Sequence, residues 1–404
     1  MDARAHLRRT GLVVILLALI TGAGPASTAA SRGGDWGQTD HDAARSRSST
    51  APSQLTPSTV TGVRAQQKFT GGPVACETEK GFEGAPVVSG NRLYALRTRQ
   101  ISGTVTVWLT ARSLRSGALI WQKQVDATGD NTQWGELTVS GDRLLAVGLN
   151  CRPPIATQGR VHAFSTSDGR RLWQSREPGP WSWLSVSGRH VVTTGSSVEG
   201  GYSAVLDVRD GSTSWVKFSP GCGAGLPVVV RSALIMTHCR ASGPSAVASR
   251  RLSDGRILWK NTGRVPLVPI RAAADGSVVI TGDSRFLPVT VAALNARTGA
   301  LRYRLKTEAV LAVGPELLFT RCGNAVCDHA RLSGERVWQT RLPAGASEPA
   351  VVAAGVLYLA DGTVIDADSG AVLGDLWKGT ADELTVARDR VVVTTGATMT
   401  VYGR

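Results

Sequence analysis

The chain has 404 residues, which is long enough for one large domain with a sizeable core. Its 45 lysine and arginine residues outnumber its 31 aspartate and glutamate residues, and the formal net charge is +14. Such a charge is compatible with binding to anionic wall polymers or lipid head groups, or with a merely solvated basic surface. Nucleic acid is not expected as a partner, because the N-terminus predicts export.

Residues 1–30 have the pattern of a secretory signal peptide. Arg4, Arg8 and Arg9 precede the apolar run 11–20, and small residues follow it. Ten apolar residues are too few to cross a bilayer comfortably, so a retained membrane anchor is the less favoured alternative. The residues after Arg9 fit a twin-arginine signal poorly, and we expect the general export pathway.

The mature protein is expected to be secreted or extracytoplasmic and monomeric, with no integral membrane segment. The first cysteine is Cys76, far from the cleavage region, so no lipid anchor is predicted. Residues 31–61 are interpreted as a flexible lead-in segment. Residues 62–404 contain the periodic pattern described next.

One short pattern recurs seven times: a small polar residue, a glycine, three variable residues and an apolar or aromatic residue. The copies are Gly117/Trp121, Gly169/Trp173, Gly211/Trp215, Gly255/Trp259, Gly299/Tyr303, Gly334/Trp338 and Gly370/Gly374. The glycines are 52, 42, 44, 44, 35 and 36 residues apart. This is close to the length of a four-stranded propeller blade and too irregular for stacked helical pairs. Glycine suits the positive φ of a tight hairpin, so the repeat predicts an all-β propeller.

The aromatic residue of each copy is expected to pack against a neighbouring blade, where it would bury about 150–250 Å². The predicted docking residues are Trp121, Trp173, Trp215, Trp259, Tyr303 and Trp338.

The glycine pattern occurs seven times, but a count of the predicted strands indicates eight blades. After the seventh copy an eighth set of strands begins at 384–393 and 399–402, and the chain ends without an outer strand. The segment 62–69 precedes the first complete blade and lacks a partner, so we predict that it closes the ring. The alternative is a seven-bladed ring with an additional C-terminal hairpin.

Six cysteines in an exported chain predict three disulfides. If the chain forms propeller blades, four of the cysteines lie in two pairs on either side of a hairpin or turn. The remaining two cysteines then form the third pair. The predicted pairs are Cys222–Cys239, Cys322–Cys327 and Cys76–Cys151, all on one face of the ring. Buried free thiols are the alternative, and zinc is less expected because no four-ligand set accompanies these cysteines.

Aligning the innermost strands of the blades predicts a ligand-binding mouth of the central channel. Acidic and indole side chains occupy the matching entry positions: Glu83, Trp134, Glu136, Trp181, Trp183, Glu348 and Asp382. Such a set could hold a cation, a basic peptide or a sugar. The alternative is that the tryptophans pack between blades and the carboxylates pair with arginine.

The repeat resembles that of the quinoprotein, or PQQ-like, eight-bladed propellers, whose unit reads roughly Ala-x-Asp-x-x-(Thr/Ser/Asp)-Gly-x-x-x-Trp. The segments 163–173, 205–215, 293–303 and 364–374 match it to varying degree, and 35–45 is similar to the lead-in of such propellers. The resemblance covers residues 35–404 and implies the fold. The same fold serves dehydrogenases, assembly scaffolds and sensors, so it does not fix the activity.

Quinoprotein dehydrogenases of this kind hold PQQ against a disulfide between adjacent cysteines and place calcium beside a catalytic aspartate. No two cysteines of this chain are adjacent, and no Cys-x-x-Cys-His haem motif or Gly-x-Ser-x-Gly elbow occurs. We therefore predict no cofactor, no metal and no catalytic residues. The favoured function is a secreted binding or scaffold module for a protein or cell-envelope partner, and the alternative is a reduced PQQ-dependent oxidoreductase.

Overall fold

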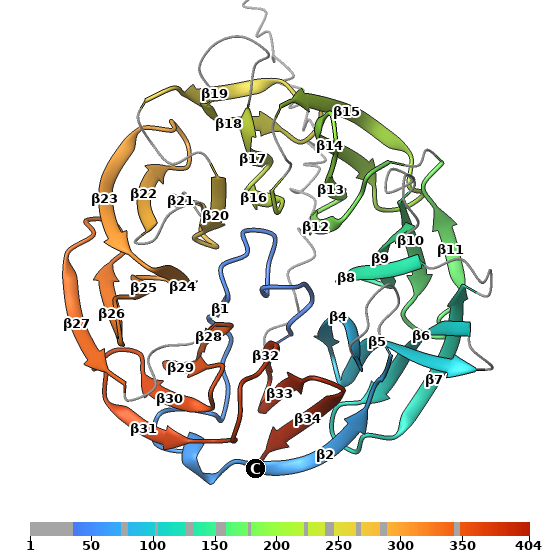
Figure 1. Cartoon of the computed structure of the whole chain (residues 1–404), viewed down its shortest axis with the longest axis horizontal. Coiled ribbons are helices and arrows are strands. Elements are labelled where there is room, and N and C mark those ends of the chain that lie inside the picture. Colours follow the sequence, from blue (N-terminus) through green and yellow to red (C-terminus); the bar gives the residue numbers. More distant parts are fainter. Residues whose placement is uncertain are drawn as a thin grey trace, which may run out of the picture.

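Short strands and glycine turns alternate around a ring, which Figure 1 shows face-on. The computed structural model describes residues 35–73, 80–101, 104–126, 132–150, 159–176, 179–221, 225–238, 246–263, 268–282, 289–342 and 348–404. The predicted signal peptide lies outside the described residues. Within them the sheets number eight, which confirms the predicted eight-bladed all-β propeller.

Blades one to four follow the chain order, and each is an antiparallel meander of four strands, to which blade one adds the short β3. Blade one consists of β3 (Gly72–Pro73), β4 (Lys80–Ser89), β5 (Arg92–Ile101), β6 (Thr104–Ser113) and β7 (Leu119–Asp126). Blade two consists of β8 (Thr132–Ser140), β9 (Arg143–Asn150), β10 (Arg160–Ser165) and β11 (Arg171–Gln174). Blade three consists of β12 (Trp183–Ser187), β13 (His190–Ser197), β14 (Gly200–Asp207) and β15 (Thr213–Pro220). Blade four consists of β16 (Val228–Val230), β17 (Ala233–His238), β18 (Ala246–Arg251) and β19 (Ile257–Asn261).

Blades five to eight complete the circle. Blade five consists of β20 (Val268–Ala272), β21 (Val278–Gly282), β22 (Val289–Asn295) and β23 (Leu301–Thr307). Blade six consists of β24 (Ala309–Val313), β25 (Leu317–Arg321), β26 (Ala325–Ala330) and β27 (Arg336–Arg341). Blade seven consists of β28 (Ala350–Ala353), β29 (Val356–Leu359), β30 (Thr363–Asp366), β31 (Val372–Asp375) and the added β1 (Ser48–Ser49). Blade eight consists of β32 (Glu383–Ala387), β33 (Arg390–Thr395), β34 (Thr398–Gly403) and β2 (Arg64–Thr70).

The ring is closed by β2, as the sequence predicts. This strand pairs antiparallel with β34, from Arg64 opposite Gly403 to Thr70 opposite Thr398. It supplies the outer strand that the C-terminal hairpin lacks, and Figure 1 shows it beside the C-terminus. The seven-bladed alternative is therefore excluded. A single 3-10 turn, η1 (Val60–Gly62), precedes β2 and contacts β31.

The six docking aromatic residues each bridge to the next blade by the same hydrogen bond. The acceptor is always the backbone carbonyl three residues before the glycine of that blade. The bonds are Trp121 to Thr166 (3.1 Å), Trp173 to Val208 (3.0 Å), Trp215 to Leu252 (2.7 Å), Trp259 to Ala296 (3.0 Å), Tyr303 to Arg331 (2.7 Å) and Trp338 to Ala367 (3.1 Å). The aromatic ring also packs directly on that glycine.

The seventh copy of the pattern lacks an aromatic residue because the ring closes there. Blade eight passes from β34 to β2 without a glycine hairpin, so a tryptophan at Gly374 would have no carbonyl to meet. The turn η1 approaches instead, with Thr61 lying 3.8 Å from the place of a Gly374 side chain. On the other side of the closure, Gln67 of β2 takes the docking position and donates to the carbonyl of Leu114 at 3.1 Å.

Candidate functional site

The segment Asp35–Ser49 lies inside the ring and binds to the innermost strand of successive blades (Figure 1). The free edge of each innermost strand exposes N–H groups to the channel, and an unpaired buried N–H is costly. The segment accepts one such N–H from each of seven blades: Val88 to Trp36 (2.8 Å), Val139 to Gly37 (2.6 Å), Val186 to Gln38 (2.8 Å), Val229 to Ala43 (2.7 Å), Ala272 to Ala44 (2.8 Å), Val313 to Ser46 (2.8 Å) and Val352 to Arg47 (2.9 Å). Blade eight is reached by Gln54, whose N–H donates to Asp389 at 2.6 Å. Residues 35–54 therefore contact every blade.

A cluster of buried charges anchors this segment, and we call it the channel cluster (Asp40, Arg45, Arg47, Glu136 and Arg271). Asp40 pairs with Arg45 at 3.2 Å, with Arg271 at 3.4 Å and with Arg47. Burial opposes ionisation of Asp40, but its attraction to Arg47, Arg271 and Arg45 holds the pKa of this carboxyl well below its usual range. Burial and the neighbouring Arg47 lower the pKa of Arg271 to about 10.

Glu136, which the sequence assigns to the channel mouth, belongs to this cluster. Its carboxylate accepts a hydrogen bond from Arg45 at 2.6 Å and from the N–H of Leu184 at 2.7 Å. Arg45 also donates to the carbonyls of Leu184 (3.2 Å) and Pro227 (3.3 Å). Glu136 thus ties blades two and three to the N-terminal segment.

Three residues of this cluster have a left-handed backbone. The φ angles are +58° at Asp40, +54° at Arg45 and +52° at Arg47. Residues other than glycine rarely adopt this conformation, and arginine gains no local hydrogen bond from it. The ion pairs and the contacts with the blades together hold the strained turns in place.

The other acidic residues near the channel cluster are more accessible than Asp40 and Glu136. Glu348 and Asp382 are exposed, and the neighbouring Glu383 is half-buried. Burial and the negative charge of Asp40 raise the pKa of Glu383 to about 7. The sequence alignment selected Asp382 and missed Glu383, one residue further along, whose carboxyl interacts with the channel cluster. The side chain of Glu83 lies outside the described residues.

The predicted indoles do not gather at the mouth. Trp134 is only 1% exposed, and its ring centroid lies 4.8 Å from that of His162 between blades one and two. Trp181 is also buried, and Trp183 is half-buried. Burial, followed by the nearby arginines, lowers the pKa of His162 to about 4, so this residue is a neutral core group.

Cys322 and Cys327 form the disulfide expected from their positions around a turn, with an S–S distance of 1.94 Å. It joins the end of β25 to β26. The other four cysteines, Cys76, Cys151, Cys222 and Cys239, lie outside the described residues.

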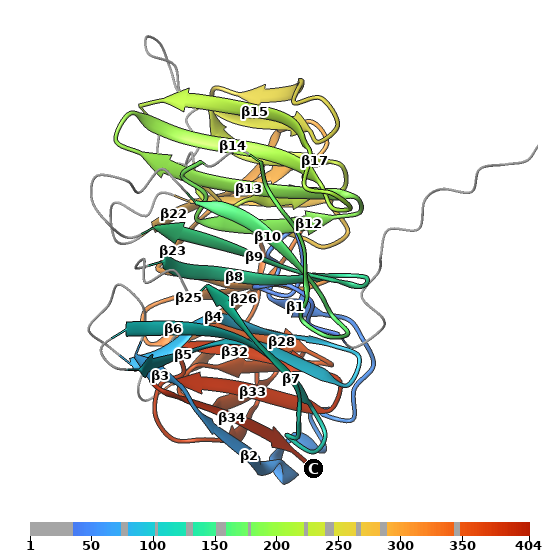
Figure 2. The same ribbon diagram turned by 90° about the vertical axis from the view of Figure 1, so that its right-hand side faces the viewer.

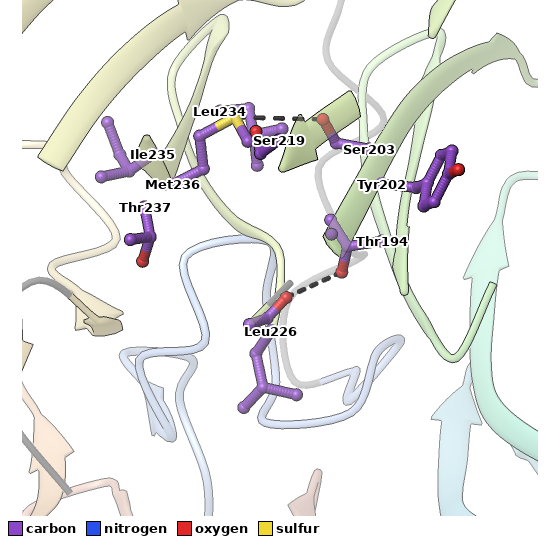
Figure 3. Close-up of a pocket in the computed structure, with 11 residues that line it drawn as sticks. Thr194, Tyr202, Ser203, Ser219, Leu226, Leu234, Ile235, Met236 and Thr237 are labelled. Carbon is purple, nitrogen blue, oxygen red and sulfur yellow. Dashed lines mark hydrogen bonds between the residues drawn. The ribbon is translucent and has the colours of Figure 1, made fainter. Parts of the chain in front are cut away.

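A surface pocket lies between blades three and four, and Figure 3 shows its lining. Thr194, Tyr202 and Ser203 come from blade three, and Leu234 and Met236 come from blade four. Thr194 donates to the carbonyl of Gly225 at 2.8 Å, and the hydroxyl of Ser203 approaches the sulfur of Met236 at 3.9 Å. The lining is apolar with hydroxyl groups and contains no carboxylate or basic side chain, so it suits binding rather than acid–base chemistry.

Neither a metal cluster nor a membrane helix is found in the part of the chain that the structure describes. No three His, Cys, Asp or Glu residues there are arranged to hold a metal ion. No helix there is long and apolar enough to span a bilayer.

The family model PQQ_2, described as outer membrane protein assembly factor BamB, matches residues 59–218 and 107–264, which together cover half of the chain. The chain belongs to the PQQ-like β-propeller family. A comparison with curated proteins finds no match for this propeller.

Several solved structures have a similar fold and align with most of this chain. Quinohemoprotein alcohol dehydrogenase from Comamonas testosteroni is 12% identical with a TM-score of 0.62, over 93% of this chain and 81% of the other. BamB from Moraxella catarrhalis is 16% identical with a TM-score of 0.52, over 85% and 98%. Chaetomium thermophilum Sqt1, solved bound to the N-terminus of ribosomal protein L10, is 15% identical with a TM-score of 0.57, over 78% and 94%. At these identities the likeness establishes the fold of the propeller.

Proposed function

We propose that this PQQ-like propeller is an exported, non-catalytic binding or scaffold module for a protein or cell-envelope partner. The observation that carries the proposal is the N-terminal segment in the axial channel. Its backbone satisfies the inner strand edges, and its arginines neutralise Asp40 and Glu136. A partner then meets the loops and outer walls of a rigid ring, which is the usual place for recognition on such scaffolds.

The residues present do not fit the PQQ and calcium of the quinoprotein dehydrogenases. The chain has no adjacent cysteines, and the described acidic residues form no group suited to calcium. Asp40 and Glu136 are committed to arginine, and Glu348 and Asp382 are exposed. The reaction of a quinoprotein oxidoreductase has no support in these side chains.

The surface best suited to a protein partner lies on blade three beside the pocket of Figure 3. Val198 is fully exposed at the turn between β13 and β14, and Phe218 on β15 is 44% exposed. The ring of Phe218 lies 4.8 Å from that of Tyr202, a residue that lines the pocket. Exposed apolar side chains beside a pocket are typical of docking surfaces.

The test is recovery of the partner from a cell-envelope extract by the wild-type protein and by Val198→Asp/Phe218→Ser. We expect the double variant to lose a partner that wild type retains in stoichiometric amount. Val337→Asp, which places a charge at an equally exposed apolar position on β27, should retain it. Equal recovery by the double variant would contradict this docking surface.

A titration with PQQ and calcium, followed by the quinone absorbance, tests the catalytic alternative. If the protein is a binding module, the quinone absorbance should show no saturable change as the protein is titrated. Saturable binding at micromolar PQQ would overturn the proposal and favour an oxidoreductase.

A further inference from the structure

Blades eight and one meet at a pocket lined by two arginines. Arg97 on β5 and Thr110 and Arg112 on β6 come from blade one, and Phe69 on β2 and Met399 on β34 come from blade eight. Leu93 and Ala95 form the rest of the lining. The pocket therefore lies on the joint at which the ring closes.

Arg112 is fixed in this pocket by contacts with both blades. Its guanidinium lies 4.7 Å from the centroid of the Phe69 ring, within the range of a cation–π contact. One of its NH groups donates to the carbonyl of Gly117 at 2.9 Å. This is its one hydrogen bond among the described residues, and a guanidinium has five N–H groups to donate.

Two buried N–H donors on β5 and β6 have no acceptor among the described residues. The Nε of Arg97 and the Nε1 of Trp108 are both buried from solvent without a hydrogen-bond partner. Arg97 and Trp108 are directly opposite each other in the β5–β6 register, so their side chains share one face of the sheet. Unsatisfied buried donors are rare in native proteins, and a bound ion is one of the causes.

The two arginines also lack a counter-charge among the described residues. Among the described residues no carboxylate forms an ion pair with Arg97 or Arg112 (ion pairs at up to 4 Å). Burial lowers the pKa of Arg112, and the positive charge of Arg97 lowers it further. Like charges placed together without an acid destabilise the free pocket and favour an anion.

We propose that the pocket between blades eight and one binds a phosphate-class oxyanion. Arg97 and Arg112, which both line the pocket, would each donate to different oxygens, which a tetrahedral anion allows. Guanidinium groups are well matched to phosphate oxygens. The anion is either free phosphate or a phosphodiester of a larger molecule, and it would hold the first blade to the last.

The experiment measures calorimetric binding and thermal unfolding of the whole protein with inorganic phosphate and with dimethyl phosphate. Sodium chloride at equal ionic strength removes the general effect of salt. We expect saturable binding and a rise of Tm that increases with phosphate concentration. Binding of dimethyl phosphate as well would identify a phosphodiester as the source, and binding of inorganic phosphate alone would identify the free ion.

Arg97→Gln separates this role from a structural one. Arg97 makes no ion pair or hydrogen bond among the described residues, so its loss relieves repulsion and should leave Tm in chloride unchanged or higher. The dissociation constant of the Arg97→Gln variant for phosphate should be about tenfold or more above that of wild type, as expected for loss of a hydrogen bond to a charged group. The matched control is Arg64→Gln/Arg115→Gln, which removes exposed arginines from the same two blades.

The control variant should bind phosphate as wild type does. Absence of saturable binding in wild type, or unchanged binding in Arg97→Gln, would overturn the proposal. This result is independent of the search for a partner at blade three.

Discussion

Each docking aromatic residue and the glycine of the next blade form one unit. The indole of Trp259 donates to the carbonyl of Ala296, and its ring covers Gly299. A β-carbon on Gly299 would lie 2.4 Å from the ring, closer than real contacts allow. Two separate constraints therefore favour glycine at position 299. Its φ of +72° disfavours other residues, and the aromatic ring of the preceding blade leaves no space for a β-carbon.

Replacing Gly299 by alanine should destabilise the protein more than the backbone effect alone explains. Gly188 has a similar φ of +59° and open space around it, so Gly188→Ala measures the backbone cost, about 1–2 kcal/mol. Gly299→Ala should cost about 1–3 kcal/mol more, because the indole must move. Urea denaturation of both variants measures the difference, and equal costs would refute the packing role.

Asp328 occupies an unusual position in the repeat. It lies opposite Trp338, where blades two and five have Ala163 and Ala293 opposite their aromatic residues. The side chain is fully buried, and neither of its oxygens has a hydrogen bond of good geometry, although the nearby backbone N–H of His329 favours the ionised form. Burial, with a smaller contribution from the negative charge of Asp368, raises its pKa to about 7.

The stability contribution of Asp328 should therefore fall as pH rises from about 4 to about 7. Over this range the folded state keeps a proton that the unfolded state releases, so increasing pH favours unfolding. Asp328→Ala should remove this dependence and stabilise the protein at pH 7 by up to about 4 kcal/mol. The free energy of unfolding of both proteins at pH 4 and pH 7 gives the comparison. A constant difference between them would contradict the assignment.

At the scale of elements, the N-terminal segment acts as an inner belt for the blades. Its hydrogen bonds reach seven separate strands, and Arg45 supplies ion pairs to Asp40 and Glu136 at its centre. Figure 2 shows from the side that the blade strands run across the thickness of the ring, so the belt meets their ends near one face.

Arg45→Ala should destabilise the protein by about 3–5 kcal/mol, because it leaves buried Glu136 without a counter-charge and removes one of the three arginines that pair with Asp40. Arg251→Ala removes an exposed pair with Asp254 and should cost at most about 1 kcal/mol. Guanidinium chloride denaturation of the two variants provides the test. Similar small losses would show that Arg45 does not anchor the belt.

The repeat allowed the blades, the closing strand and the docking residues to be predicted, because glycine and tryptophan mark local geometry. The belt could not be predicted in this way. Its partners, such as Val139 and Val313, are far from it in sequence and carry no motif. Of the predicted channel-mouth residues, Glu136 lies in the channel cluster, whereas Trp134 and Trp181 are buried, which an alignment of the inner strands on their turns does not reveal. A register shift between Trp134 and Leu137 also changes the local alternation of side chains.

For the whole molecule, the belt and the closing strand predict a single unfolding transition. Repeat proteins whose units contact only their neighbours can unfold in parts. Here residues 35–54 touch every blade, and β2 joins the two ends of the ring. Tryptophan fluorescence and far-UV circular dichroism should therefore report the same denaturant midpoint. Separate midpoints would show that groups of blades unfold independently.

The pairing of β2 with β34 also sets an order of events during synthesis. Blade eight needs residues 64–70 and residues 383–403, so its outer strand is translated long before the strands it pairs with. The belt likewise has no complete channel to occupy until the last inner strand has emerged. The native ring is thus unavailable to a partly synthesised chain, which can close it only after residues 383–403 have been made.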